Sequence, residues 1–226
     1  QGLFKKTHFD AIISDYDMPD RDGLSFLRYI RRKENRIPFV MLTGKGREEI
    51  IIDALNNGAD LYLEKSESAR DLFSHLTEKL IPLIRSKQAE VIFHEIFTQS
   101  PISIGLFNAD GNILQVNPAF MDLFGVKIPM DLAPFNLFHD PHIPEDTVKK
   151  IKAGERVEYA VPFSFELVKR HNLFKTSRNN EIFIDVMITP ISLSQPELTG
   201  GYLVQIQDLT EKKQSEIALK TSEERY

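Results

Sequence analysis

The chain of 226 residues has no cysteine and no tryptophan, and its 28 basic side chains are outnumbered by 33 acidic ones. Without cysteine no disulfide can form, which is compatible with a reducing cytosol. The formal net charge of −5 disfavours nucleic acid as a partner. No apolar run reaches membrane-spanning length and no signal peptide is present, so we expect a cytoplasmic protein with no membrane segment in this chain. The length leaves room for two domains that each bury a core.

An apolar run that ends in a carboxylate stands near the start of the chain. Residues 11–13 are uniformly apolar, and Asp15 follows them. Such a run is typical of a parallel strand that is covered on both faces. Open α/β sheets place their chemistry at the carboxyl ends of their strands. The pattern therefore predicts that Asp15 is a functional carboxylate at a sheet edge.

Two further apolar runs follow the same plan. Residues 38–42 lead to Thr43, and residues 61–64 lead to Lys65. Helical patterns alternate with these runs, which favours βαβ units and a parallel sheet. A hydroxyl group and an ammonium group would then join Asp15 at one edge, where both can bind an anion.

These residues resemble the receiver domain of two-component response regulators. The motif that carries the resemblance is Asp15-x-x-Met18-Pro19-x-x-Asp22-Gly23, then Thr43, then Tyr62-x-x-Lys65. The resemblance implies a flavodoxin-like α/β fold over residues 1–84. It also implies that a histidine kinase or phosphotransfer protein donates a phosphoryl group to Asp15. In that family Thr43 and Lys65 would bind the phosphate, and the rotamer of Tyr62 would report its presence.

The resemblance also implies a Mg²⁺ site, and here the sequence departs from the family. Asp15 and the backbone carbonyl of Asp17 would be ligands, but the acidic pair that completes the site has no counterpart in this sequence. A hard divalent ion needs several oxygen ligands. We therefore expect a receiver that is truncated at its N-terminus, with an incomplete sheet, and we expect this chain alone to bind Mg²⁺ weakly and to be phosphorylated poorly.

Each residue of the motif also has a plainer interpretation when it is taken alone. Asp15 could cap the following helix, and Thr43 could be an ordinary hydroxyl at a strand end. Tyr62 could be a core aromatic, and Lys65 a solvated surface charge. Only their joint order and spacing favours the functional interpretation.

An enzyme is the less favoured alternative. Asp15-Tyr16-Asp17 also resembles the opening of haloacid-dehalogenase-type phosphatases, in which Asp15 would be the nucleophile and Asp17 the general acid and base. No later acidic cluster completes that motif. The interval from Asp15 to Thr43 is also short for that fold.

A helical pattern extends from residue 68 to about residue 99. Its first part would be the last receiver helix, and Pro82 would kink or divide it. Apolar residues continue beyond Pro82, so we expect a helical linker over residues 85–100. Such a linker favours a homodimer, formed through this helix or through helices of the following domain.

The pattern changes to antiparallel strands from residue 101 onwards. A hairpin with an Asp-Gly turn comes first, and Asn117-Pro118 then starts a short helix. Alternating apolar residues predict three later strands, over 157–168, 181–188 and 201–207. This order of elements predicts an α+β fold with an antiparallel sheet and short helices.

Residues 101–210 resemble a PAS domain. The motifs that carry the resemblance are Asp110-Gly111-x-Ile113-x-x-x-Asn117-x-Ala119-Phe120 and Gln207-Asp208-Leu209-Thr210-Glu211-Lys212-Lys213. The resemblance implies that Asp208 and Thr210 join the last strand to an exit helix. That helix would span residues 211–226 and lead toward a further domain.

A PAS domain can hold a ligand, and the candidate pocket wall is largely aromatic. Its candidate members are Phe107, Phe120, Phe124, Phe135, Leu137, Phe138, Phe165, Phe183 and Met187. Such a set is more typical of a filled core than of a cofactor site, so the ligand is unknown and both options stay open. The lack of cysteine excludes cysteinyl-flavin photochemistry. His139 and His142 are expected to be loop residues rather than haem ligands.

The sequence thus predicts a phosphorelay protein in which phosphorylation of Asp15 acts through a helix on a PAS domain. In the alternative, the receiver is a passive scaffold, and the PAS domain is a module for ligand binding or dimerisation. No ATP-binding segment is visible, so we do not expect kinase activity in this chain.

Overall fold

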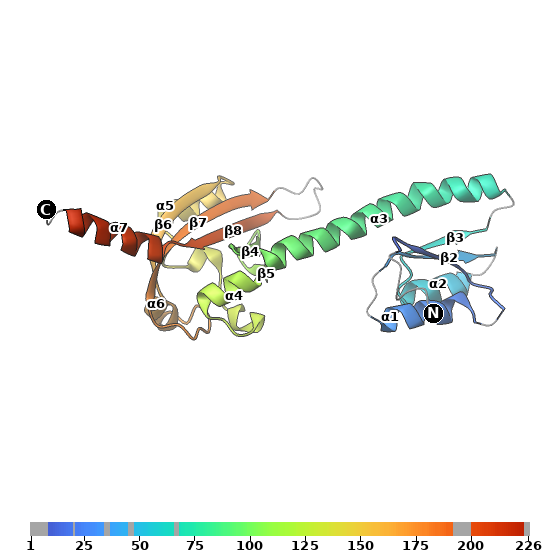
Figure 1. Ribbon diagram of the computed structural model, residues 1–226, viewed down its shortest axis with the longest axis horizontal. Helices are drawn as coiled ribbons and strands as arrows, with labels where there is room; N and C mark the ends of the chain where they lie inside the picture. The colour runs from blue at the N-terminus through green and yellow to red at the C-terminus, as the bar shows by residue number, and fades with distance from the viewer. Residues whose placement is uncertain are drawn as a thin grey trace. The chain divides into compact units, whose positions relative to one another are not determined.

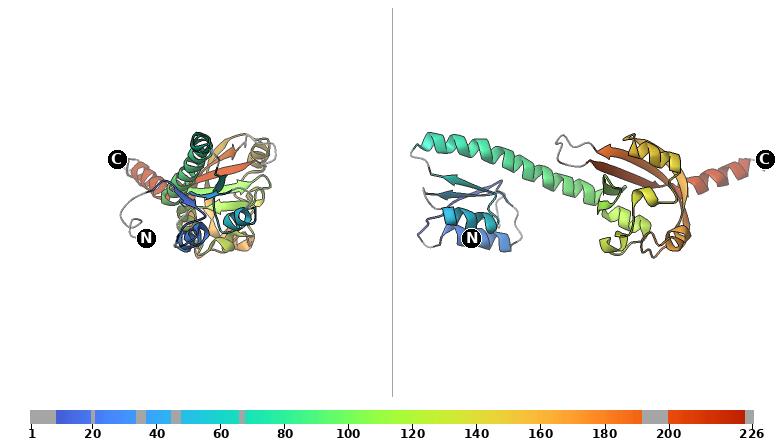
Figure 2. Two further views of the ribbon diagram at one scale, coloured as in Figure 1. Left: turned by 90° about the vertical axis from the view of Figure 1, so that its right-hand side faces the viewer. Right: turned by 180° about the vertical axis from the view of Figure 1, so that it is seen from behind.

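The computed structural model describes residues 9–19, 21–33, 37–44, 48–65, 68–191 and 200–223. The chain forms two compact units, Gln1–His94 and Glu95–Tyr226, and each has its own sheet (Figures 1 and 2). No helix in these described segments is both long and apolar enough to cross a membrane.

The first unit is built on a parallel sheet of three strands in the order β1-β2-β3. Its elements before the long helix are β1 (Ile12–Asp15), α1 (Gly23–Arg32), β2 (Phe39–Thr43), α2 (Glu48–Asn56) and β3 (Leu61–Glu64). Asp15 lies opposite Leu42, and Thr43 lies opposite Glu64. The carboxyl ends of all three strands therefore meet at one edge, as the alternation of strands and helices predicts.

Apolar side chains of α1 hold this helix against the sheet. Leu24, Leu27 and Ile30 recur at helical spacing and share one buried cluster with Phe39 and Met41 of the central strand. Figure 1 shows α1 and α2 on the same side of the sheet. Arg31 of α1 adds a polar contact, because its Nη2 lies 2.8 Å from Oδ2 of Asp60 just before β3.

The long helix α3 (Ala69–Gln99) runs through Pro82 without a break. Of the two outcomes expected at Pro82, a kink or a division, the division does not occur. Proline removes one backbone donor, and its ring crowds the preceding turn. Pro82 is exposed, so water can satisfy the carbonyl group that loses its partner. Near the middle of α3, Nζ of Lys87 lies 3.6 Å from Oδ1 of Asp60, so this part of the helix contacts the residue that precedes β3.

The second unit contains an antiparallel sheet of five strands in the order β5-β4-β8-β7-β6. Its strands are β4 (Ser103–Asn108), β5 (Ile113–Val116), β6 (Val157–Ser164), β7 (Glu181–Ile191) and β8 (Gly201–Asp208). Its helical segments are α4 (Pro118–Phe124), η2 (Pro129–Leu132), η3 (Leu137–His139), α5 (Glu145–Lys152), α6 (Phe165–Arg170) and α7 (Thr210–Glu223). The predicted α/β plus α+β architecture is confirmed.

One predicted strand is too long. The expected strand over 157–168 ends at Ser164, where the helix α6 begins. The Ser164 side chain accepts a hydrogen bond from the backbone N–H of Leu167 at 3.5 Å, and so serves as the N-cap of α6. Apolar residues continue past this point because α6 also faces the core, so hydrophobicity alone does not mark the boundary.

The core of the second unit lies between the sheet and the helical segments that connect β5 to β6. Along β7 the exposure alternates, with Ile184, Val186 and Ile188 buried and the residues between them partly exposed. The buried face of β7 shares one apolar cluster with Phe120 and Phe124 of α4. One face of the sheet is therefore covered, while the other is more accessible.

Asn117 is the polar anchor of this core. It is fully buried, and its Oδ1 accepts hydrogen bonds from the backbone N–H groups of Ile104 and Phe120, both at 2.9 Å. Its Nδ2 donates to the carbonyl of Ile102 at 2.8 Å. The residue thus caps α4, as predicted, and also joins that helix to β4.

Candidate functional site

Asp15 and Lys65 meet at the carboxyl edge of the parallel sheet. Nζ of Lys65 donates a hydrogen bond to Oδ2 of Asp15, although 50 residues separate them in the sequence. The backbone N–H of Asp17 donates to Oδ1 of Asp15 at 3.3 Å. The Lys65 ammonium lowers the pKa of Asp15 below its ordinary value of 3.8, against an opposing effect of burial. Asp15 is therefore an ionised carboxylate with a cation beside it at neutral pH.

The carboxylate of Asp15 is accessible to a reaction partner. Its side chain is 33% exposed, and that of Lys65 is 42% exposed. An ion pair that is this open to water contributes little to stability. This ion pair therefore does little to stabilise the fold, and it leaves both charged groups accessible to a reaction partner.

A close backbone contact shapes the loop that follows Asp15. A Cβ atom at Gly23 would overlap the carbonyl oxygen of Asp15 and would lie 2.8 Å from Sδ of Met41. The backbone N–H of Gly23 donates to the carbonyl of Tyr16 at 2.9 Å. Asp22 then caps α1, because its Oδ1 accepts from the N–H of Ser25 at 2.6 Å. The Asp-Gly pair of the motif therefore lets α1 begin directly against the strand end.

Thr43 ends the neighbouring strand and is fully buried. Its Oγ1 has no hydrogen-bond partner among the described residues. A buried hydroxyl without a partner costs about 1–3 kcal/mol. Tyr62, on the next strand, is 40% exposed rather than buried in the core. The structure thus joins Asp15 directly to Lys65, whereas Thr43 and Tyr62 make no hydrogen bond to Asp15.

The described residues do not complete a Mg²⁺ site. No three His, Cys, Asp or Glu side chains in these residues come together in a group that could hold a metal ion. Asp15 and the Asp17 carbonyl would supply only two oxygen ligands, and Mg²⁺ requires near-octahedral coordination. A Mg²⁺ ion at this place would therefore need further oxygen ligands.

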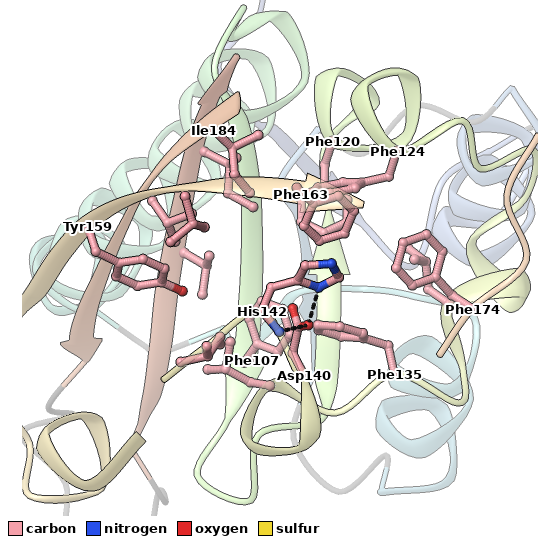
Figure 3. Close-up of a pocket in the computed structure, with 17 residues that line it drawn as sticks. Phe107, Phe120, Phe124, Phe135, Asp140, His142, Tyr159, Phe163, Phe174 and Ile184 are labelled. Carbon is pink, nitrogen blue, oxygen red and sulfur yellow. Dashed lines mark hydrogen bonds and ion pairs between the residues drawn. The ribbon is translucent and has the colours of Figure 1, made fainter. Parts of the chain in front are cut away.

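A second candidate site is a cavity of about 40 Å³ inside the antiparallel unit (Figure 3). It lies between the inner face of the sheet and the helical segments. Its wall includes five of the aromatic and aliphatic residues that the sequence suggested, namely Phe107, Phe120, Phe124, Phe135 and Leu137.

Four other suggested residues do not line this cavity. Phe183 and Met187 alternate with the buried residues of β7, so they lie on its opposite face. Phe165 is buried in the core but belongs to α6, beyond the end of β6. Phe138 packs against Tyr202 instead, with 5.6 Å between ring centroids. The expectation that these four form the pocket wall is therefore corrected.

The polar end of the cavity consists of Asp140, His142 and Tyr159. Sequence reasoning named His142 only as a loop residue and missed Asp140 and Tyr159. Oδ1 of Asp140 lies 2.7 Å from Nδ1 of His142 and accepts the backbone N–H of His142 at 3.0 Å. The backbone N–H of Ser164 donates to Nε2 of His142 at 3.2 Å. The His142 ring stacks on Phe163, with 4.0 Å between centroids. His142 thus sits in a loop, as expected, yet both of its nitrogens are engaged.

Tyr159 faces the same cavity from β6. Burial, together with the nearby charge of Asp140, raises the pKa of the Tyr159 phenol, so the hydroxyl stays protonated. The alternation of β6 carried the signal that could have identified it. Val157 and Phe163 are buried on this strand, and Tyr159 shares their face because every second side chain points the same way.

Asp208 is the last residue of β8, and Thr210 is the first residue of α7. Oδ1 of Asp208 accepts the backbone N–H of Thr210 at 2.8 Å. Oγ1 of Thr210 accepts the backbone N–H of Phe183, on β7, at 2.9 Å. Nζ of Lys213 lies 5.4 Å from the centroid of the Phe183 ring. The start of α7 is therefore attached to the neighbouring strand β7 by side chains of the predicted exit motif.

Comparison with known proteins gives a match for each unit. Residues 2–77 match the family model of the response regulator receiver domain, and residues 92–157 match that of the PAS domain. The chain is 36% identical over 115 residues to a probable transcriptional regulator, ycf27, of Galdieria sulphuraria, which covers 50% of this chain and 43% of that protein. It is 30% identical over 96 residues to the phosphate regulon transcriptional regulatory protein PhoB of Escherichia coli K12, which covers 42% of each chain. The chain thus spans less than half the length of these two relatives.

The solved structures with some similarity to this chain include a PAS domain and a response regulator. The PAS domain of an HTR-like protein from Haloarcula marismortui is 17% identical, with a TM-score of 0.42, and covers 57% of this chain and 99% of that one. A putative response regulator from Chloroflexus aurantiacus J-10-fl is 26% identical, with a TM-score of 0.31, and covers 34% of this chain and 65% of that one.

Proposed function

We propose that Asp15 is the phosphoacceptor of this chain, whose response regulator receiver domain and PAS domain point to two-component signal transduction. The donor would be the phosphohistidine of a histidine kinase or of a phosphotransfer protein. An oxygen of Asp15 attacks phosphorus, the P–N bond breaks, and the histidine ring takes up a proton from solvent. We also propose that this exchange takes place in the cytoplasm.

The contact between Asp15 and Lys65 carries this proposal. A nucleophilic carboxylate must be ionised and reachable, and Asp15 meets both requirements. The transferring phosphoryl group brings further negative charge, and the ammonium of Lys65 stands where it can neutralise that charge. The Thr43 hydroxyl, which has no partner among the described residues, is a donor that a phosphoryl oxygen on the neighbouring strand end would satisfy.

Phosphorylation would change the charge balance at the sheet edge. The phosphoryl group on Asp15 would draw Lys65 and Thr43 toward it, and Tyr62 would repack beside them. Tyr62 is already partly exposed, so a change of its rotamer alters the surface of the unit. We infer that this altered surface acts on α3, and through that helix on the PAS domain.

Mapping the phosphorylated residue tests this function. The purified chain is incubated with a phosphorylated histidine phosphotransfer protein and Mg²⁺, and the modified peptide is identified by mass spectrometry. We expect slow labelling that is confined to Asp15 and is abolished in Asp15→Asn. The matched control is Asp53→Asn, which removes an exposed carboxylate of α2 and should leave labelling unchanged. Labelling that persists in Asp15→Asn would refute the assignment.

A second candidate function is that the PAS domain is a ligand-binding module and the receiver a passive scaffold. The cavity with its polar end favours this alternative. The two candidates are separated by measuring the signalling output of the full-length protein with Asp15→Asn. A lost output supports the phosphoacceptor, whereas an unchanged output supports the scaffold.

We further propose that α3 mediates a homodimer. Val91, Ile92 and Ile96 are 58%, 58% and 65% exposed on this helix. Exposed apolar residues at such spacing favour a second helix as their partner. Light scattering should show a dimer for the chain and a shift to monomer for Ile92→Glu. A monomeric chain at micromolar concentration would contradict this proposal.

A further inference from the structure

The polar end of the PAS cavity contains a carboxylate that its histidine neighbour does not neutralise. Nε2 of His142 accepts the backbone N–H of Ser164, so this nitrogen carries no hydrogen. The ring proton is therefore on Nδ1, where it is donated to Oδ1 of Asp140. This is the neutral form of the imidazole. The neutral imidazole of His142 therefore does not balance the negative charge of Asp140.

No other cation reaches this carboxylate from the described wall of the cavity. The described residues that line the cavity include neither lysine nor arginine. The Asp140 side chain is only 9% exposed. Both hydrogen bonds between Asp140 and His142 use Oδ1, and Oδ2 accepts no hydrogen bond from a described residue. A buried charge in this state is costly unless an opposite charge or a hydrogen-bond donor joins it.

The rest of the cavity wall suits a cation that carries apolar groups. Phe107, Phe120, Phe135 and Phe163 surround the space, and Tyr159 faces it from β6 (Figure 3). The faces of aromatic rings attract ammonium ions, most strongly where water is excluded. The Tyr159 hydroxyl has no hydrogen bond to a described residue, and it can accept one from an N–H donor.

The size of the cavity limits the ligand. At about 40 Å³ it is much smaller than the roughly 150 Å³ void that accepts benzene in another protein. A ligand that leaves the wall in place therefore has only about two to four non-hydrogen atoms. Small alkylammonium ions meet this limit and also match the charge of the site.

We propose that the PAS cavity binds a small alkylammonium ion, with Asp140 as its counter-ion and the aromatic wall around its alkyl group. His142 positions the carboxylate, and Tyr159 accepts an additional hydrogen bond. This inference rests on the second candidate function, ligand binding by the PAS domain, and it is independent of phosphorylation at Asp15.

Calorimetric titration of the whole chain with ethylammonium chloride tests the proposal. Ethanol and sodium acetate, at equal ionic strength, provide neutral and anionic probes of similar size. We expect saturable binding of ethylammonium and at least tenfold weaker binding of the other two. Asp140→Asn keeps the shape of the side chain and should weaken ethylammonium binding roughly 10- to 100-fold. Tyr159→Phe should weaken it by a few-fold.

The matched control is Asp185→Asn, which removes one negative charge from the opposite face of the sheet and should leave binding unchanged. Circular dichroism checks that each variant is folded. If Asp140→Asn does not fold, titration of the unaltered chain with the three probes still shows whether the cavity selects the cation.

Two results would overturn the proposal in different ways. Ethanol that binds as well as ethylammonium would refute the counter-ion role of Asp140 but leave ligand binding by the PAS domain in place. Failure of all three probes to bind would refute the proposal and also weaken the second candidate function. Neither result bears on Asp15, whose labelling is a separate measurement.

Discussion

The backbone N–H of Phe183 on β7 donates a hydrogen bond to the hydroxyl of Thr210, the first residue of α7, at 2.9 Å. Leu209 strengthens this junction, because its backbone N–H donates to the carbonyl of Phe183 at 2.8 Å. The last helix is thus attached to a strand of the sheet whose other face lines the cavity. A shift of the β7 backbone at Phe183 would therefore be passed directly to the start of α7.

Thr210→Val should weaken this attachment. Valine has nearly the same shape but cannot accept the hydrogen bond, so the N–H of Phe183 loses its partner. We expect the PAS domain to lose about 1 kcal/mol of stability in urea denaturation. Thr189→Val on β7, the strand of Phe183, is the control, because no hydrogen bond of its hydroxyl to a described residue is lost. Equal destabilisation by both variants would show that the Thr210 contact has no special role.

Gly23→Ala should disturb the proposed phosphorylation site through the backbone. A Cβ atom at this position overlaps the Asp15 carbonyl, so the strand end or α1 must shift. We expect a loss of about 2 kcal/mol in the stability of the receiver and slower labelling of Asp15. Gly44→Ala is the control, since a Cβ there would meet no atom within 4 Å. A Gly23→Ala variant as stable as the Gly44→Ala variant would contradict the clash.

The stability of the receiver should fall in acid. The backbone N–H of Ser25 lowers the pKa of Asp22 below 3.8 in the folded state, so folding favours the ionised carboxylate. The resulting stability is present at neutral pH and is lost as the pH falls below about 4, through the folded-state pKa. Asp22→Asn keeps the N-cap but cannot titrate. Thermal melts between pH 3 and 7 should therefore show a weaker pH dependence for this variant, and an unchanged profile would refute the assignment.

Lys65→Met should raise the pKa of Asp15 toward its ordinary value, because the largest factor that lowers it is the Lys65 ammonium. The carboxyl resonance of Asp15 in an NMR titration measures this shift directly. Labelling by the phosphodonor should also slow, since the transferring charge loses its cation. Lys87→Met is the control, because its contacts are with Asp60 and Glu90. If the Asp15 pKa does not move in Lys65→Met, the ion pair is not formed in solution.

Much of the receiver could be predicted because its signals are local. Local sequence patterns are enough to locate the strands and the start of the first helix. These patterns are the apolar run before Asp15, the Asp-Gly pair at 22–23, and the polar residues that end the next two strands. Parallel pairing then brings the strand ends to one edge, whatever the details of packing. The contact of Asp15 with Lys65 follows from that topology. In contrast, the lack of a described hydrogen-bond partner for the Thr43 hydroxyl depends on the surrounding side chains and could not be predicted.

The PAS cavity was harder to predict because its wall depends on which face of each strand is covered. Hydrophobicity suggested Phe183 and Met187, yet both share a face with Asp185, which is the polar signal that this face points outward. Phe165 was misplaced for a different reason. Ser164 ends the strand as a helix cap, and no break in the apolar pattern accompanies it.

The sequence alone determined the order of the elements in the parallel unit, the two kinds of sheet, and the residues at the ends of the parallel strands, because these depend on short-range periodicity and on turn and capping residues. Only the tertiary structure decided that Asp140, His142 and Tyr159 share a cavity and that Pro82 lies within one continuous helix. Both outcomes depend on neighbours and solvent that no local pattern encodes: the burial of a carboxylate by distant strands and loops in one case, and the access of water to a helix face in the other.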